Sequence, residues 1–244
     1  MSRAAADAAP APYTGVSELE TMELAVRYHA WTFSVVRPFI GRRVLEVGGG
    51  LGSLSRSLLD RERLVILDYD AVCAARLTES FAATANVRVL QGDIADPRSV
   101  EPLGGERLDT AICVNVLEHV EDDRAALANM RRALSPGGRL VLLVPAHPSL
   151  YGTLDKLVGH HRRYTRAEAL EKVRGAGFTI ERSRYFNSVG ALGRFLIGRV
   201  ARQQSTGKGQ VLFYDRFVVP VLRPLERVIP PPFGQSLIVI GAAE

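Results

Sequence analysis

A carboxylate and a run of glycines near residue 50 are the first candidates for chemistry. Glu46 lies in an apolar stretch that predicts a buried strand over 43–47, and Gly48, Gly50 and Gly52 follow it. A buried carboxylate is rare unless it has a partner. Glycines at a strand-to-helix turn leave bare backbone against which a ligand can lie. The stretch therefore predicts a binding site for a ligand with a cationic group or several hydrogen-bond donors.

Two classes of cofactor site use such a loop. The dinucleotide fingerprint G-x-G-x-x-G would run through Gly48 and Gly50 to Ser53, so its third glycine is missing. The pattern E-x-G-x-G-x-G fits instead, and it resembles motif I of class I S-adenosylmethionine (SAM) methyltransferases. SAM carries a sulfonium, an α-ammonium and a carboxylate, so an acid beside it makes chemical sense. The resemblance implies that Glu46, Gly48, Gly49 and Gly50 bind the cofactor; a glycine-rich structural turn is the alternative.

An acid also follows the second predicted strand, 64–67. Asp68 comes 20 residues after Gly48, where a carboxylate suits a bidentate hydrogen bond to ribose hydroxyls. We assign Asp68 and its neighbour Tyr69 to the cofactor site. Asp70 is expected to cap the helix that follows.

A third acid follows the predicted strand 87–90. By resemblance to the methyltransferases, Asp93 accepts a hydrogen bond from the adenine amino group and Ile94 packs against the ring. The alternative is that Asp93 caps the next helix. Asp96-Pro97 already supplies a cap and a first-turn proline, which favours the ligand role.

The segment Asn115–Val120 follows a predicted strand over 108–114, and it resembles the methyltransferase turn that forms the floor of the SAM site. This places Asn115 and Val116 at the cofactor. His119 is a candidate base, although Leu-Glu-His also occurs in family members of varied chemistry. The Asn/Asp-Pro-Pro-aromatic motif of DNA amino-methyltransferases is absent here, which argues against a nucleobase amine as acceptor.

Three of the five histidines lie in the loop after the predicted strand 139–146. The carboxyl end of a parallel strand is where α/β enzymes place substrates, so His147 and His160 are candidate catalytic bases. Tyr151, His160 and Tyr164 are candidate substrate contacts.

A structural explanation of this loop stays open, in which His160 pairs with Asp155 inside a hydrogen-bonded cluster. The histidine spacing of 147, 160 and 161 fits no standard zinc motif, and we expect no metal.

Helical periodicity predicts a helix over 17–37, and by resemblance to the methyltransferases this helix closes over SAM. Tyr28 is the aromatic residue that it offers to the cofactor, with core packing as the alternative, and Trp31 is expected in the core. Alternation predicts a strand over 178–186, and a final strand is expected over 236–242. Ser53 is expected to cap a helix that runs to about residue 61. By resemblance, the fold is a Rossmann-like three-layer α/β sandwich whose seven-stranded, mostly parallel sheet has an antiparallel last strand.

The chain divides into four predicted parts. They are a disordered leader over 1–12, an N-terminal helical lid over 13–41, a SAM-binding core over 42–186 and 236–244, and a helical cap over the substrate site at 187–235.

The cap should hold a helix over 188–202, a polar loop over 203–210 and an apolar stretch over 211–228. A helical hairpin that only extends the core is the alternative. A weak contact with a membrane surface is also open, because arginines flank the apolar residues of the first helix.

Net charge and composition limit the classes of partner that we expect. The net charge is +5, but the 31 basic residues are scattered and include only three lysines, so we expect no nucleic-acid partner. No apolar run is long enough for a membrane helix, the leader does not resemble a signal peptide, and the two cysteines suit a reducing compartment. We expect a cytoplasmic protein; the sequence does not give its oligomeric state.

The expected activity is methyl transfer from SAM to a small-molecule oxygen, nitrogen or electron-rich carbon, with S-adenosylhomocysteine (SAH) as product. The stretch His160–Tyr164 and the prolines at 230–232 resemble bacterial members associated with natural-product or glycosyltransferase genes, which suggests secondary metabolism or glycan- or lipid-linked biosynthesis. The alternatives are a non-catalytic SAM-binding partner subunit and an NAD(P)-binding reductase. The Tyr-x-x-x-Lys pair common in such reductases is absent.

Overall fold

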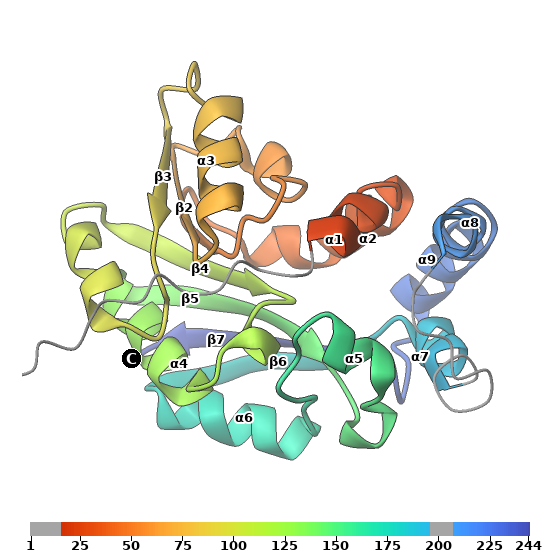
Figure 1. Ribbon diagram of the computed structural model, residues 1–244. Coiled ribbons are helices and arrows are strands. Elements are labelled where there is room, and N and C mark those ends of the chain that lie inside the picture. Colours follow the sequence, from red (N-terminus) through yellow and green to blue (C-terminus); the bar gives the residue numbers. More distant parts are fainter. Residues whose placement is uncertain (1–15, 196–206) are drawn as a thin grey trace, which may run out of the picture.

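A computed structural model describes residues 16–195 and 207–244 (Figure 1). The predicted leader, the end of the predicted helix 188–202 and most of the polar loop after it lie outside these residues. No helix in the described ranges is both long enough and apolar enough to cross a membrane.

One seven-stranded sheet forms the centre of the molecule, with strand order β3-β2-β1-β4-β5-β7-β6. Strand β7 pairs antiparallel with both β5 and β6, and the other pairs are parallel. The fold class predicted from the sequence is therefore confirmed. The strands are β1 (Arg43–Val47), β2 (Arg63–Asp68), β3 (Val87–Gln91), β4 (Leu108–Val114), β5 (Leu134–Pro145), β6 (Phe178–Phe186) and β7 (Ser236–Ala243).

Helices cover both faces of this sheet (Figure 1). The main ones are α1 (Val16–Met22), α2 (Val26–Val36), α3 (Ala71–Ser80), α4 (Asp123–Ala133), α5 (Thr153–Leu157), α6 (Arg166–Gly175), α7 (Ser188–Phe195), α8 (Lys208–Phe213) and α9 (Val219–Val228). Side chains alternate along β1, so that Leu45 packs with α4 and α6 while Val44 packs with α2, α3 and α9. Burying each such leucine or valine contributes roughly 1.5–3 kcal/mol.

The sequence locates the strands well. The predicted ranges of β1, β4 and β6 match those of the structure, and those of β2, β3 and β7 differ by one residue at most at either end. Strand β5 differs more, because it begins at Leu134, which pairs with Leu108 before the glycine turn that was expected to precede the strand. Trp31 is 2% exposed and belongs to the core, as predicted.

Two helix predictions were wrong. The helix expected over 17–37 is broken at residues 23–25 into α1 and α2. The helix expected from Ser53 is only a 3-10 turn, Ser55–Leu58. Ser53 does not cap it, since its hydroxyl donates a hydrogen bond to the Glu23 carboxylate and so joins the glycine loop to the end of α1.

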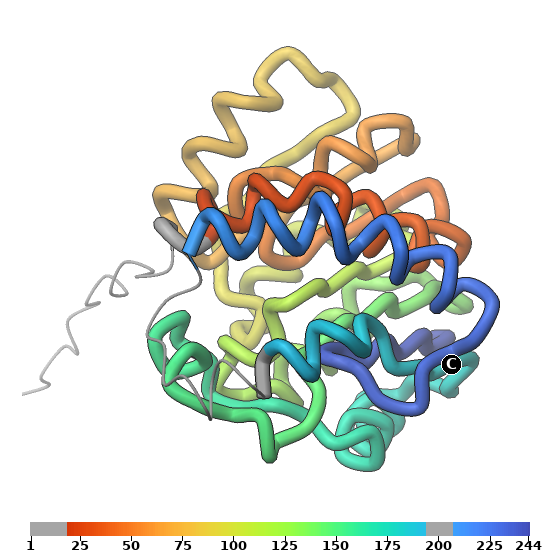
Figure 2. The backbone as a smooth tube through the Cα atoms, turned by 90° about the vertical axis from the view of Figure 1, so that its right-hand side faces the viewer, coloured from red at the N-terminus to blue at the C-terminus, as the bar shows by residue number. Residues whose placement is uncertain are grey.

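Helix α8, a π-helical turn (Tyr214–Val218) and α9 form one continuous rod beside α1 and α2 (Figure 2). The rod buries Val211, Asp215, Val219, Leu222 and Glu226, one residue per turn. The described part of 187–235 does not line the main pocket. The division into lid, core and cap stays a prediction.

The rod supplies the cap that α2 lacks. Ala25 precedes α2 and offers no side-chain acceptor. The Asp215 carboxylate accepts instead from the backbone N–H groups of Tyr28 at 2.8 Å and Arg27 at 3.2 Å. Asp215 is only 4% exposed, so these charge-assisted bonds are shielded from water.

We predict that Asp215→Ala lowers the free energy of unfolding by about 1–3 kcal/mol, because it removes both a helix cap and a buried charge-assisted hydrogen bond. Urea unfolding measures the change. Asp60→Ala is the matched control, since Asp60 is exposed and makes only surface ion pairs, and it should change stability by less than about 0.5 kcal/mol. Equal effects of the two substitutions would contradict the capping role.

Candidate functional site

A pocket of about 790 Å³ opens at the carboxyl ends of β1 to β4. The chain leaves β1 toward β2 on one side and later returns to place β4 on the other. Loops diverge at such a switch in strand order and leave a crevice, which is where open α/β sheets bind ligands.

The glycine loop forms the floor of the pocket. Gly48, Gly50 and Gly52 have φ angles of 74°, 55° and 83°, which glycine adopts without strain. A Cβ atom on Gly48 would lie 2.2 Å from Cγ2 of Val116. The loop therefore runs flush against the turn after β4, and only bare backbone fits there.

Glu46 lies beneath this loop and is 1% exposed. Its Oε2 atom has no hydrogen-bond partner among the described residues, although the residue lines the pocket. Burial, and secondarily the nearby charge of Asp68, raises the pKa of Glu46 to about 8. A cationic ligand group beside it would supply the missing partner.

Asp68 accepts two backbone hydrogen bonds that the sequence does not predict. Its Oδ2 accepts from the Gly50 N–H at 2.8 Å and its Oδ1 from the Asp70 N–H at 2.9 Å. The carboxylate thus holds the glycine loop against the end of β2, and each oxygen keeps lone pairs for a ligand in the pocket. Asp70 caps α3 as predicted, accepting from the N–H groups of Val72 and Cys73.

Asp93 and Ile94 line the same pocket. Oδ1 of Asp93 also accepts a hydrogen bond from the Ala95 N–H at 2.8 Å. Asp93 therefore stabilises its own turn, as the structural alternative suggested, in addition to lining the pocket. Asp96 provides the cap for the following 3-10 turn, as expected.

Helices α1 and α2 line the pocket through Leu19, Met22, Tyr28, His29 and Thr32. Of these five residues, only Tyr28 was predicted to be at the site. Its spacing of four residues from Thr32 puts both on one face of α2, which is the signal that could have found Thr32.

All eleven predicted cofactor residues lie in the pocket lining. They are Tyr28, Glu46, Gly48, Gly49, Gly50, Asp68, Tyr69, Asp93, Ile94, Asn115 and Val116.

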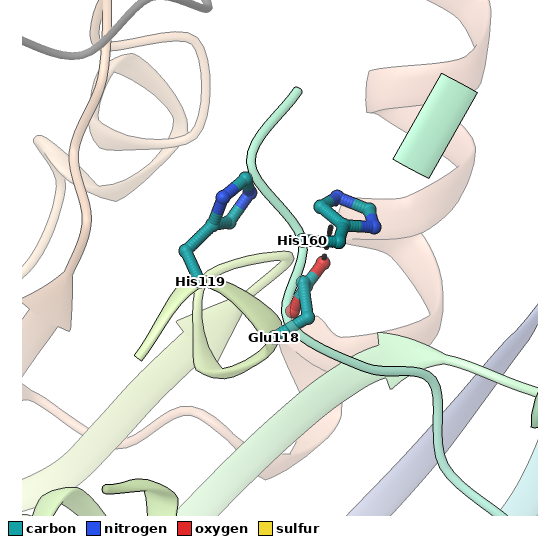
Figure 3. Close-up of side chains that lie close together, drawn as sticks. All are labelled: Glu118, His119 and His160. Atoms are coloured by element: carbon teal, nitrogen blue, oxygen red, sulfur yellow. Dashed lines mark ion pairs between the residues drawn. The ribbon is translucent and has the colours of Figure 1, made fainter. Parts of the chain in front are cut away.

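A second polar group stands at another part of the pocket wall, where His119 and His160 lie with their ring centroids 4.6 Å apart and perpendicular. Between them lies Glu118, which is fully buried and whose two carboxylate oxygens lack hydrogen-bond partners among the described residues (Figure 3). Burial raises the pKa of Glu118 to about 8, and burial, with the nearby His160, lowers the pKa of His119 to about 4.

The pairing of His160 with Asp155, left open by the sequence, is present: Nδ1 of His160 lies 3.0 Å from Asp155 Oδ1. Arg163 donates to the same carboxylate at 2.9 Å. Tyr151 does not line the pocket, but its hydroxyl donates to the carbonyl of His160 at 2.7 Å. The loop is thus a structural cluster and also part of the pocket wall.

The structure does not bring His147 or Tyr164 to this pocket. His147 stacks on Tyr185, with centroids 5.0 Å apart. Tyr164 is 1% exposed, and its hydroxyl donates to Asp123 at 2.9 Å. An aromatic residue in a loop can belong to the core instead of a binding site. Tyr164 belongs to the core because its hydroxyl group binds the buried carboxylate of Asp123, which is distant in sequence.

Comparison with known proteins agrees with this geometry. A methyltransferase-domain family model matches residues 45–140, which hold the glycine loop, Asp68, Asp93 and the turn after β4. The solved structure of a SAM-dependent methyltransferase from Thermotoga maritima superposes with a TM-score of 0.63 at 18% identity, covering 94% of this chain and 97% of that one.

Residues 45–140 belong to a methyltransferase domain, and the fold around them is that of the class I SAM-dependent methyltransferases.

Sequence relatives of this methyltransferase domain match over part of their length. The "Probable S-adenosylmethionine-dependent methyltransferase" of Mycolicibacterium smegmatis is 30% identical over 58% of this chain and 53% of that protein. The "Ubiquinone biosynthesis O-methyltransferase" of Paramagnetospirillum magneticum is 34% identical over 43% and 41%. The chain therefore spans about half the length, or less, of these curated relatives.

Three features of the methyltransferase pocket suit SAM. Within residues 16–195 and 207–244, the buried Oε2 of Glu46 has no hydrogen-bond partner, so an ammonium could bind there. A bare-backbone cradle admits close approach, and the Asp68 carboxylate keeps lone pairs for a ligand at the end of β2. An N-methyltransferase from Bradyrhizobium japonicum, solved in complex with SAH, has a similar fold, with a TM-score of 0.54 at 14% identity over 93% of this chain and 87% of that one.

We predict that the ligand-free protein loses stability as the pH rises, because of Glu46. Its folded-state pKa of about 8 exceeds the ordinary value of 4.5, so between these pH values the folded state holds a proton that the unfolded state has released. Glu46→Gln should therefore gain stability relative to wild type from pH 5 to pH 9, by up to about 4 kcal/mol.

Urea unfolding across this pH range measures the difference. Glu62→Gln alters an exposed carboxylate and should leave the pH dependence of wild type unchanged. Parallel curves for wild type and Glu46→Gln would show that Glu46 is ionised in the folded protein without a ligand.

Proposed function

We propose that this protein transfers the methyl group of SAM to a small-molecule acceptor. One observation carries the proposal: a single pocket joins a glycine cradle and the Glu46 carboxylate to a second wall that bears two histidines, with the Glu118 carboxylate buried next to them. Among the described residues, neither carboxylate has its full set of hydrogen-bond partners. The first set suits SAM, and the second offers groups that can hold an acceptor and handle its proton.

The cofactor-binding residues are the eleven of the pocket lining named above. In this proposal Glu46 binds the ammonium, Asp68 the ribose hydroxyls and Asp93 the adenine amino group, with Ile94 against the ring. Asn115 and Val116 form the floor next to the methyl group. SAM supplies the electrophilic methyl group, and the chain's own work is to align the acceptor behind it and to exclude water.

His119 and His160 are the proposed acceptor-side residues. An acceptor hydroxyl must lose its proton, whereas an amine or an electron-rich carbon needs less help. His147 is not retained as a catalytic candidate, nor Tyr164 as a substrate contact, because neither lies at the pocket. Tyr151 acts on the site only by holding the backbone of His160.

An oxygen acceptor is the form of the proposal best supported by the relatives. Those at 30–37% identity include ubiquinone biosynthesis O-methyltransferases and an O-methyltransferase from Pyrenophora dematioidea. Histidines with a carboxylate also suit a hydroxyl more than an amine. We place the reaction in cytoplasmic biosynthesis of a bacterial metabolite or a glycan- or lipid-linked compound.

We predict that calorimetry detects tight SAH binding and none of NAD or NADP. Asp68→Asn should weaken SAH binding about 10- to 100-fold, because hydrogen bonds to a charged group contribute about 1.5–3 kcal/mol. Asp68→Ala should weaken it further, since the Gly50 loop also loses its acceptor. Asp96→Asn is the matched control: Asp96 also caps backbone N–H groups but lies outside the pocket lining.

Binding of NAD or NADP in place of SAH would contradict the methyltransferase proposal and favour a reductase. Tight SAH binding without transfer of a labelled methyl group to any of a panel of hydroxyl, amine and carbon acceptors would favour a non-catalytic partner subunit.

We also propose a weak contact between the α8–α9 rod and an anionic membrane surface. Phe213, Phe217, Val221 and Val228 are 57–79% exposed along it. Both acids of the rod are buried, whereas Lys208, Arg216, Arg223 and Arg227 are exposed. An apolar face flanked by basic residues alone suits an anionic lipid surface.

We predict that the protein sediments with vesicles containing phosphatidylglycerol and much less with pure phosphatidylcholine vesicles. The double substitution Phe213→Ser and Phe217→Ser should reduce the bound fraction at least tenfold, because both rings lose their apolar contact. Val72→Ser, at an exposed apolar residue of α3, is the control and should bind as wild type does. Absence of wild-type binding to anionic vesicles would exclude the contact.

A further inference from the structure

The Glu118, His119 and His160 side chains place one carboxylate oxygen and two imidazole nitrogens within 4.8 Å of one another (Figure 3). The first two residues come from the 3-10 turn Leu117–His119 after β4, and His160 comes from the loop after α5. The two histidines line the pocket, so the cluster is reached from it.

The carboxylate of this cluster is not satisfied by the protein. Glu118 is fully buried, and neither of its oxygens accepts a hydrogen bond from a described residue. Nε2 of His160 lies 3.8 Å from Oε1 of Glu118. This distance exceeds a hydrogen bond but is close to the separation of two ligand atoms that share one metal ion at about 2.1 Å each.

Hydrogen bonds with other residues orient both imidazole rings. Nδ1 of His160 is held by the Asp155 carboxylate, which also accepts a hydrogen bond from Arg163. Nε2 is then left as the acceptor nitrogen on the side of Glu118. His119 is held by a hydrogen bond with the backbone of Gly159. Carboxylate and backbone partners of this kind fix the ring and raise its basicity where a histidine binds a metal.

We propose that Glu118, His119 and His160 bind a divalent transition-metal ion, and that its open coordination positions face the pocket, where they accept an oxygen of the acceptor. Two nitrogens and one carboxylate favour Zn²⁺, Co²⁺, Fe²⁺ or Mn²⁺ over Mg²⁺, which prefers oxygen ligands. The inference rests on the proposed function and deepens it, since a cation here selects acceptors with a hydroxyl or chelating oxygens.

This site differs from the expectation of no metal. That expectation depended on the spacing of His147, His160 and His161, but only His160 of these three belongs to the cluster. The ligands come from two segments that only the fold brings together.

The test titrates metal-free protein with Zn²⁺ and with Co²⁺, by calorimetry and by the visible absorption of bound Co²⁺. Wild type should bind one ion. Glu118→Gln and His160→Gln should each weaken binding at least tenfold, and Asp155→Asn should weaken it about 10- to 100-fold through loss of the support to His160. His161→Gln is the matched control and should leave the affinity unchanged.

Equal Zn²⁺ affinity of wild type, Glu118→Gln and His160→Gln would overturn the inference, as would absence of stoichiometric binding by wild type. SAH binding and thermal unfolding are measured on the same samples. SAH binding without metal binding would overturn the metal site alone, whereas loss of SAH binding by wild type would reject the proposed function. Glu118→Gln keeps the shape of the side chain and removes a buried charge, so it is expected to fold.

Discussion

The end of the pocket formed by the glycine loop depends on two hydrogen bonds to the Asp68 carboxylate. One oxygen holds the Gly50 N–H and the other holds the Asp70 N–H, so the loop after β1 and the turn after β2 share a single anchor. Gly48 then lies flush against Val116 at the end of β4. Three adjacent strands thus fix one another's carboxyl ends, and a flexible loop becomes a rigid floor. A ligand that binds here meets donors that are already ordered, which lowers the entropic cost of binding.

Two buried carboxylates oppose the stability of the fold at two places around the same pocket. Glu46 and Glu118 are both almost completely buried. One oxygen of Glu46 and both oxygens of Glu118 lack hydrogen-bond partners in the part of the chain that the structure describes. Burial raises the pKa of each to about 8, which measures the cost of keeping them charged. Core packing would place an apolar side chain at either position. The coincidence of both with one cavity is why we read them as ligand-binding groups and not as packing defects.

The sequence predicts what is encoded locally. Apolar runs located the strands, and the cap of α3 by Asp70 was correct because donor and acceptor are two or three residues apart. The residues expected at the cofactor all reached one pocket, since the carboxyl ends of parallel strands share an edge. The break between α1 and α2 was missed. Its cause lies far along the chain, at Asp215, which caps α2, and Glu226 likewise accepts from the N–H groups of Asn187 and Ser188 at the start of α7. No local pattern marks an acid on one helix as the cap of another.

The two ends of the pocket also differ in how far they are encoded locally. The cofactor end is built from consecutive strand ends, so a motif of regular spacing describes it. The acceptor end joins the turn after β4 to the loop around α5. The backbone N–H of His161 donates to the carbonyl of Glu118 at 2.8 Å, and the Arg162 guanidinium donates to the carbonyl of Glu121 at 2.7 Å. Contacts between these two segments, which are far apart in the sequence, set the register between them. A loop of different length after β5 would therefore change this wall of the pocket without disturbing the glycine loop at its floor, so the fold allows one end of the pocket to vary while the other is kept.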